Sequence, residues 1–168
     1  MIKKFTSALA NKTIKQLNEE KSILLNKEQR NCVYKAYKDE EPTIPEYDYS
    51  MTRARVQLID EQVRKIKHAL NIFNCETVLP ELNVTIDEAL VLMAQLEQSK
   101  NTLSTLKDRD SISRVESFRN TNAVPEFVYT NYDVKVAAGD YEEISKKIID
   151  IQLALDTVNQ TVTFEVDV

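Results

Sequence analysis

The sequence predicts a mainly α fold: an antiparallel helical bundle or hairpin of long helices with a small β element near the C-terminus. Three observations predict it. The 168 residues include 1 glycine, whereas a β-rich fold with many tight turns needs more. Two long segments place apolar residues at alternating spacings of three and four, which is the heptad pattern of packed helices. The last residues change to a spacing of two, which is typical of a strand.

The clearest predicted helix covers residues 49–74. Its apolar positions form one seam, which consists of Tyr49, Thr52, Val56, Ile59, Val63, Ile66, Leu70 and Phe73. Leu58 and Ala69 lie beside the seam and widen the apolar arc, which predicts burial against more than one helix. Asp48 or Ser50 is placed to cap the helix N-terminus.

A less regular helix is expected over residues 3–30. Its buried side is marked by Phe5, Leu9, Ile14, Leu17 and Leu24. Asn31 is its candidate C-terminal cap, because Asn tolerates the left-handed conformation. The following CVYKAY segment, residues 32–37, fits either a last helical turn or a short strand. Pro42 and Pro45 then mark a loop that leads to the central helix.

The third helix is predicted over residues 85–108. Thr85 and Glu88 match the capping box, in which each side chain binds the backbone N–H of the other residue. The connector before it, residues 75–84, is ten residues long. A connector of this length makes an antiparallel hairpin of the central and third helices the simplest arrangement.

The fourth helix is predicted over residues 134–158, with Asp133 as its cap. Its seam again alternates three and four: Val134, Ala137, Tyr141, Ile144, Ile148, Ile151, Leu155 and Val158. Gly139 lies in the first turns and costs about 1 kcal/mol relative to Ala. A start after Asp140 is therefore the alternative. Residues 109–132 break the helical pattern, and the EFVYTNY stretch within them reads as extended.

The C-terminal strand is expected over residues 161–168. Its alternating positions are Val162, Phe164, Val166 and Val168. A lone strand is not stable, so its candidate mates are EFVYTNY, CVYKAY or the same tail of another subunit. The heptad helices and this tail together favour a homo-oligomer, in which residues 1–168 form a single helical domain.

The charge is unevenly distributed along the chain. Residues 1–74 carry 14 basic and 10 acidic residues, while residues 75–168 carry 8 and 17, giving +4 and −9. Such halves are expected to pack on each other or to join subunits, and an acidic chain disfavours a nucleic-acid partner.

The cysteine spacing and the lengths of the apolar runs suggest where the protein is located. Cys32 and Cys75 form no disulfide framework or metal motif, so we expect a reducing compartment and two buried thiols. No run of about 18 apolar residues exists, so no membrane span is expected. We predict a cytoplasmic protein of bacterial or phage origin.

Scattered motifs resemble a known group of proteins. They are the KIKHA and FN residues between Lys65 and Asn74, the Thr85–Glu88 helix start, YTNYD at 129–133 and ALDTVN at 154–159. They are similar to an uncharacterised family of small bacterial helical, coiled-coil-like proteins, whose members carry automatic names such as septicolysin or viral A-type inclusion protein. The resemblance implies no mechanism, and no membrane-inserting hairpin supports the cytolysin name.

Catalytic chemistry is poorly represented. His68 is the one histidine, which excludes sites that need two. A single glycine excludes a phosphate-binding P-loop, a dinucleotide fingerprint and a nucleophile elbow. We therefore expect no catalytic residues, no metal site, no cofactor and no enzyme activity.

One polar stripe on the central helix is the candidate ligand site: Arg53, Arg64, Lys67, His68 and Asn71. Guanidinium and ammonium groups bind phosphates well, and in an oligomer the stripe could line a groove between subunits, with Tyr47, Tyr49, Tyr129 or Tyr132 stacking on a base. The alternative is a solvated face, which an Asp60–Arg64 pair favours.

Two classes of function follow from the sequence. The first is a non-catalytic oligomeric structural or interaction protein, whose partner is itself or another protein. The second is a protein that binds and sequesters a phosphorylated small molecule, such as a nucleotide, between subunits.

Overall fold

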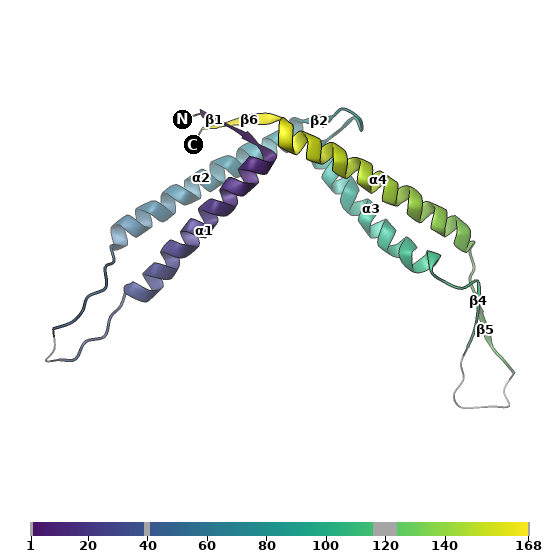
Figure 1. Ribbon diagram of the computed structural model, residues 1–168, viewed down its shortest axis with the longest axis horizontal. Coiled ribbons are helices and arrows are strands. Elements are labelled where there is room, and N and C mark those ends of the chain that lie inside the picture. Colours follow the sequence, from purple (N-terminus) through teal and green to yellow (C-terminus); the bar gives the residue numbers. More distant parts are fainter. Residues whose placement is uncertain (1, 39–40, 116–123, 168) are drawn as a thin grey trace. The chain divides into compact units, whose positions relative to one another are not determined.

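The computed structural model describes residues 2–38, 41–115 and 124–167 and confirms the mainly α fold. In chain order the elements are β1 (Ile2–Thr6), α1 (Ser7–Asn31), α2 (Tyr49–Glu76), β2 (Val78–Leu79), β3 (Val84–Thr85), α3 (Ile86–Lys107), β4 (Ile112–Arg114), β5 (Phe127–Tyr129), α4 (Val134–Thr161) and β6 (Thr163–Asp167) (Figure 1). The helices pack in pairs. The chain divides into two compact units: Met1–Thr77 with Thr157–Val168, and Val78–Asp156.

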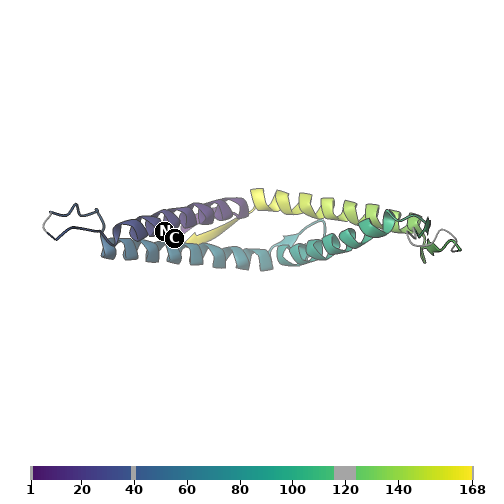
Figure 2. The same ribbon diagram turned by 90° about the horizontal axis from the view of Figure 1, so that it is seen from below.

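The first unit is an antiparallel pair of helices, α1 and α2, joined to a two-stranded sheet. The sheet is made of the two ends of the chain, β1 and β6, which run antiparallel with Phe5 opposite Phe164 (Figures 1 and 2). The core between the sheet and the helices contains Phe5, Ala10, Ile14, Ile66 and Val166. The sheet therefore covers one end of the α1–α2 pair with apolar side chains.

The N-terminal strand is a correction to the predicted first helix. Residues 2–6 form β1, and α1 begins at Ser7, where the Thr6 hydroxyl accepts the Leu9 N–H at 3.2 Å and caps the helix. β1 is also the mate of β6 within the chain, so the two mates predicted in this chain, EFVYTNY and CVYKAY, were wrong. Pairing with β1 buries Val166 and half-buries Phe164, while Val168 lies outside the described residues.

α2 follows the predicted seam closely. Its N-terminus is capped by Asp48, whose carboxylate accepts the Met51 N–H at 2.8 Å. The buried residues all belong to the predicted seam: Val56, Ile59, Ile66 and Phe73. The apolar arc is narrower than predicted, because Leu58 is 52% exposed. The partner of α2 is α1, whereas the sequence predicted the third helix in this place.

The segment after α1 has no regular structure. Residues 33–37 are neither a helical turn nor a strand, and the C-cap is Cys32 rather than Asn31, since the Cys32 N–H donates to the Glu28 carbonyl at 2.8 Å. Cys32 and Cys75 are both exposed, which corrects the prediction that they are buried. Cysteine is only weakly polar, so its sequence position alone does not decide burial.

The second unit contains α3 and the antiparallel helix α4. The Thr85–Glu88 capping box is confirmed, with the Glu88 N–H donating to the Thr85 hydroxyl at 3.2 Å. The short hairpin β2–β3 leads into α3, and Asn83 adopts a φ of 53° in its turn. Asn tolerates this left-handed conformation. Between the helices, Lys107 Nζ lies 4.9 Å from the centroid of the Tyr141 ring.

The segment between α3 and α4 contains a second short hairpin. β5 confirms the predicted extended stretch and pairs with β4, with Ile112 opposite Tyr129. α4 starts at Val134, because the Asp133 carboxylate accepts the Lys135 N–H at 2.8 Å. The alternative start after Asp140 is therefore wrong. Within the described residues, no helix is long and apolar enough to cross a membrane.

Candidate functional site

Three ion pairs connect the charged residues of α2 with those of α1. Lys21 Nζ lies 2.6 Å from an Asp60 oxygen, and Arg55 lies 2.6 Å from a Glu20 oxygen. The sequence predicted a pair between Asp60 and Arg64. In the structure, Asp60 instead pairs with Lys21 of the other helix. Exposed pairs of this kind contribute about 0–1 kcal/mol each, so their main effect is to favour one register of the two helices.

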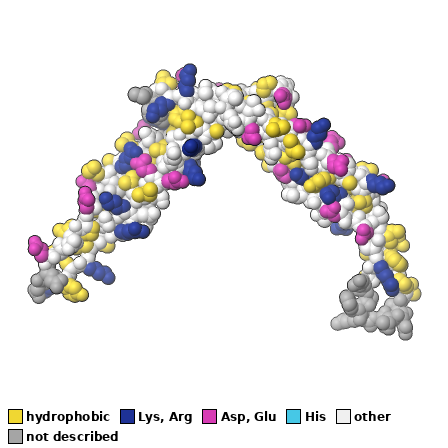
Figure 3. Space-filling view, in the orientation of Figure 1, with side chains coloured by type: hydrophobic (Ala, Val, Ile, Leu, Met, Phe, Trp, Pro, Cys, Tyr) yellow, Lys and Arg dark blue, Asp and Glu magenta, His cyan; other side chains and the backbone are white. Residues whose placement is uncertain are grey.

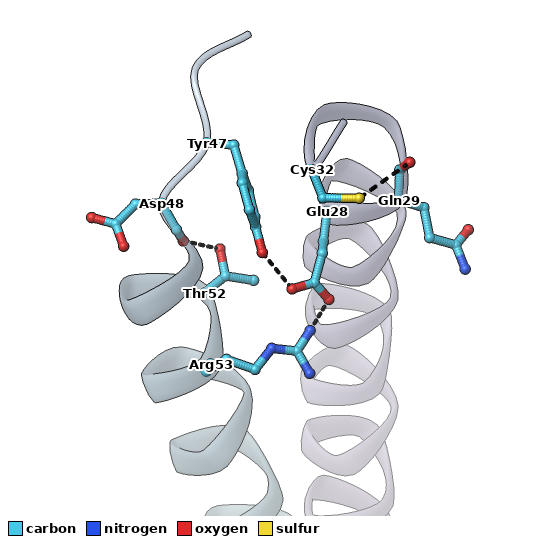
Figure 4. Close-up of polar contacts among 7 residues, drawn as sticks. All are labelled: Glu28, Gln29, Cys32, Tyr47, Asp48, Thr52 and Arg53. Atoms are coloured by element: carbon cyan, nitrogen blue, oxygen red, sulfur yellow. Dashed lines mark hydrogen bonds and ion pairs between the residues drawn. The ribbon is translucent and has the colours of Figure 1, made fainter. Parts of the chain in front are cut away.

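The third pair, Arg53 with Glu28, belongs to a cluster of Glu28, Tyr47 and Arg53, here called the Glu28 cluster. It lies where α1 ends and α2 begins (Figure 4). The Glu28 carboxylate accepts the Tyr47 hydroxyl at 2.6 Å and forms an ion pair with the Arg53 guanidinium. The Glu28 side chain is only 18% exposed. Desolvation, followed by the electrostatic effects of Cys32, Tyr49 and Asp48, raises the pKa of the Tyr47 hydroxyl above its ordinary value.

The Glu28 cluster fits a structural role better than a catalytic one. A general base needs a carboxylate oxygen that can reach a substrate proton, whereas both Glu28 oxygens already have protein partners. An open pocket of about 450 Å³ lies beside the cluster, lined in part by Leu24, Tyr47 and Met51. In its lining, the Thr52 hydroxyl donates to the Asp48 backbone carbonyl at 2.7 Å and not to a carboxylate. The cluster therefore fixes the start of α2 against the end of α1.

The predicted stripe on α2 is divided by these contacts. Arg53 forms an ion pair with Glu28 through one guanidinium nitrogen, and its side chain is 40% exposed. The other four residues, Arg64, Lys67, His68 and Asn71, are exposed and lie within two turns of each other. Figure 3 shows acidic and basic side chains interspersed over the face in view, without a large patch of one sign.

Tyr47 and Tyr49 lie at the Arg53 end of this stripe. Tyr47 belongs to the Glu28 cluster, and the Arg53 guanidinium carbon lies 5.9 Å from the centroid of the Tyr49 ring. Tyr49 is about 22 Å along the helix from Arg64, at about 1.5 Å per residue. Tyr129 and Tyr132 belong to the second unit, where the Tyr132 hydroxyl donates to the Leu106 carbonyl at 2.7 Å. The base-stacking partner that the sequence hypothesis needed is therefore not beside Arg64 and His68 within unit 1.

The described part of the chain contains no cluster of metal-ligating side chains. No group of three or more His, Cys, Asp or Glu side chains lies close enough to hold an ion there. Sequence reasoning missed Glu28, the acidic centre of a half-buried polar cluster. Its signal was weak, because Glu28 is one of many charged residues of a helix and its partners lie across a loop.

The fold thus defines a class: a mainly α chain whose helices pack pairwise and whose ends meet in a small sheet. A similar fold occurs in the crystal structure of a functionally unknown conserved protein from Corynebacterium diphtheriae, with a TM-score of 0.63 and 14% sequence identity. The match covers 96% of this chain and 99% of that chain. No family model and no curated protein matches the sequence. The likeness shows the fold and no specific role.

Proposed function

We propose that the protein is a non-catalytic, oligomeric interaction protein whose first partner is a second copy of itself. The observation that carries the proposal is apolar surface left uncovered on two helices: Met51 and Leu58 of α2 are 72% and 52% exposed, and Val91 of α3 is 55% exposed.

A run of apolar residues on α3 is only partly buried. Residues 89–94 of α3 read ALVLMA, so this part of the helix is apolar all round. A helix of that kind is typically buried on every side. Here Leu90 is 41%, Val91 55% and Leu92 37% exposed. The exposed residues support an interaction role, because contiguous apolar surface marks association sites.

The proposal is tested by sedimentation velocity over a hundredfold range of protein concentration. We expect a species heavier than one chain that dissociates on dilution. A single 19.4 kDa species at every concentration would contradict the proposal. A matched pair of variants tests whether the exposed residues of α3 take part in the contact: weaker association of Val91→Ser, with unchanged association of Gln95→Ser, also exposed on α3, would place the contact on that helix.

A second candidate function rests on Arg64, Lys67 and His68, which remain exposed on α2. Such groups are able to bind a phosphorylated small molecule. The test is thermal unfolding with and without ATP. If this candidate is correct, the Arg64→Ala, Lys67→Ala double variant loses the nucleotide-dependent rise in Tm and keeps its assembly. Equal Tm values of the wild type with and without nucleotide would exclude it.

A further inference from the structure

α2 carries a second heptad seam on its outer face. Each position of this outer seam follows a position of the buried seam by two residues, which is about 200° around the helix. The outer seam runs from residue 51 to residue 75 and is apolar towards both ends. Met51, Leu58 and Ile72 are 72%, 52% and 43% exposed, and Ala54 and Cys75 are exposed as well. Two seams on opposite faces are typical of a helix between two partners.

The middle of the outer seam is charged. Glu61 and Lys65 occupy adjacent seam positions and form an ion pair at 3.0 Å, with side chains 44% and 43% exposed. His68 follows as the next seam residue and is exposed. The seam therefore has apolar ends and an acidic and a basic residue around its centre.

We infer that the outer seam is the contact between two copies of the chain, packed through antiparallel α2 helices about a twofold axis. The inference rests on the proposed function and names its interface. An antiparallel register centred on Val63 places Glu61 opposite the partner's Lys65, and Lys65 opposite the partner's Glu61. A twofold contact requires such a self-complementary surface.

The same register pairs Met51 with the partner's Cys75 and Ala54 with the partner's Ile72, and it places Leu58 opposite the partner's His68. A parallel pair would place Glu61 against the partner's Glu61 and Lys65 against the partner's Lys65, and like charges in direct opposition are unfavourable. Charge complementarity therefore selects the antiparallel arrangement and a second copy as the occupant of the outer seam.

The first experiment uses the full chain and the exposed thiol of Cys75. In a Cys32→Ser background, Met51→Cys should give a covalent dimer on a non-reducing gel after mild oxidation with oxidised glutathione. Ser50→Cys is the matched control, because it lies one residue away and off the outer seam. We expect at least tenfold more covalent dimer from Met51→Cys than from this control.

Further substitutions separate the two directions of packing. Adding Cys75→Ser should abolish the Met51→Cys dimer if the helices are antiparallel. Persistence of the dimer, or oxidation of the Cys32→Ser background into a Cys75–Cys75 dimer, would indicate parallel helices and overturn the inference.

The second experiment exchanges the central charges. Glu61→Lys should raise the dissociation constant at least tenfold, because it opposes Lys65 with a second basic residue, and the Glu61→Lys, Lys65→Glu double variant should restore wild-type association. If the wild type associates and neither experiment gives the expected result, the interface lies elsewhere and the inference is overturned while the proposed function stands. If the wild type remains one chain at every concentration, both are overturned.

Discussion

Ile66 is a buried α2 residue in the core that the helices share with the terminal sheet. It is 1% exposed and packs in a cluster with Phe5, Ile14 and Val166. Ile66→Ala removes three carbon atoms, which costs about 2.5 kcal/mol at about 0.8 kcal/mol per buried carbon. The cavity left behind adds up to about 2 kcal/mol if its walls do not relax. We therefore expect the free energy of unfolding to fall by about 3–4 kcal/mol.

The assay is urea unfolding followed by far-ultraviolet circular dichroism, at one protein concentration because association shifts apparent stability. Ile23→Ala is the matched control, since it is the same substitution in the same helix pair at a site that is 69% exposed. The control should change the free energy of unfolding by less than about 0.5 kcal/mol. Equal losses for the two variants would refute the assignment of the core.

Three further predictions concern other parts of the chain. Gly139→Ala should raise the free energy of unfolding by about 1 kcal/mol, because Gly139 lies within α4 and an added Cβ meets nothing within 4 Å; no change in thermal unfolding would argue against a helical Gly139. Hydrogen bonds from the Thr85 backbone and hydroxyl lower the pKa of Glu88 below its ordinary value of 4.5. The lowered pKa stabilises the folded state above pH 4.5, and this stabilisation is lost as the pH falls through the lowered value. Glu88→Gln should therefore make acid unfolding less steep, and an unchanged dependence of unfolding on pH would contradict this. Glu28→Ala should leave the Arg53 charge half-buried and unpaired, and we expect faster amide hydrogen exchange in the first turns of α2. Unchanged exchange there would show that the Glu28 cluster does not fix the helix start.

The helices were predictable because their signals are local and repeated. The seam of α2 supplies eight positions in register, and the caps Asp48, Thr85 and Asp133 mark the helix starts within a few residues. Each cap binds an N–H group that no helical carbonyl can reach, so its position is determined by nearby sequence.

The terminal sheet could not be found in the same way. β1 has five residues and one fully buried side chain, Phe5, which fits a helical pattern as well as a strand pattern. Its pairing with β6 joins the two ends of the chain, so no local period reports it. The hairpin β2–β3 has two residues in each strand, which is too short for an alternation to be visible. Asn83 was its one local signal.

The surroundings of the stripe could not be predicted, because ion pairing across helices depends on how the helices are rotated. The sequence placed Arg53, Arg64, Lys67 and His68 on one helix, and all four lie on α2. Packing of α1 against α2 brings Glu28 to Arg53, which no pattern within α2 could show.

The central claim is that the chain works as an assembly of copies, and native mass spectrometry of gently purified protein tests it most directly. The account predicts a mass of twice 19.4 kDa without added ligand mass, and separation into single chains after denaturation. Added mass that is released on denaturation would instead favour the ligand-binding candidate. A species of 19.4 kDa alone at every protein concentration would contradict the central claim.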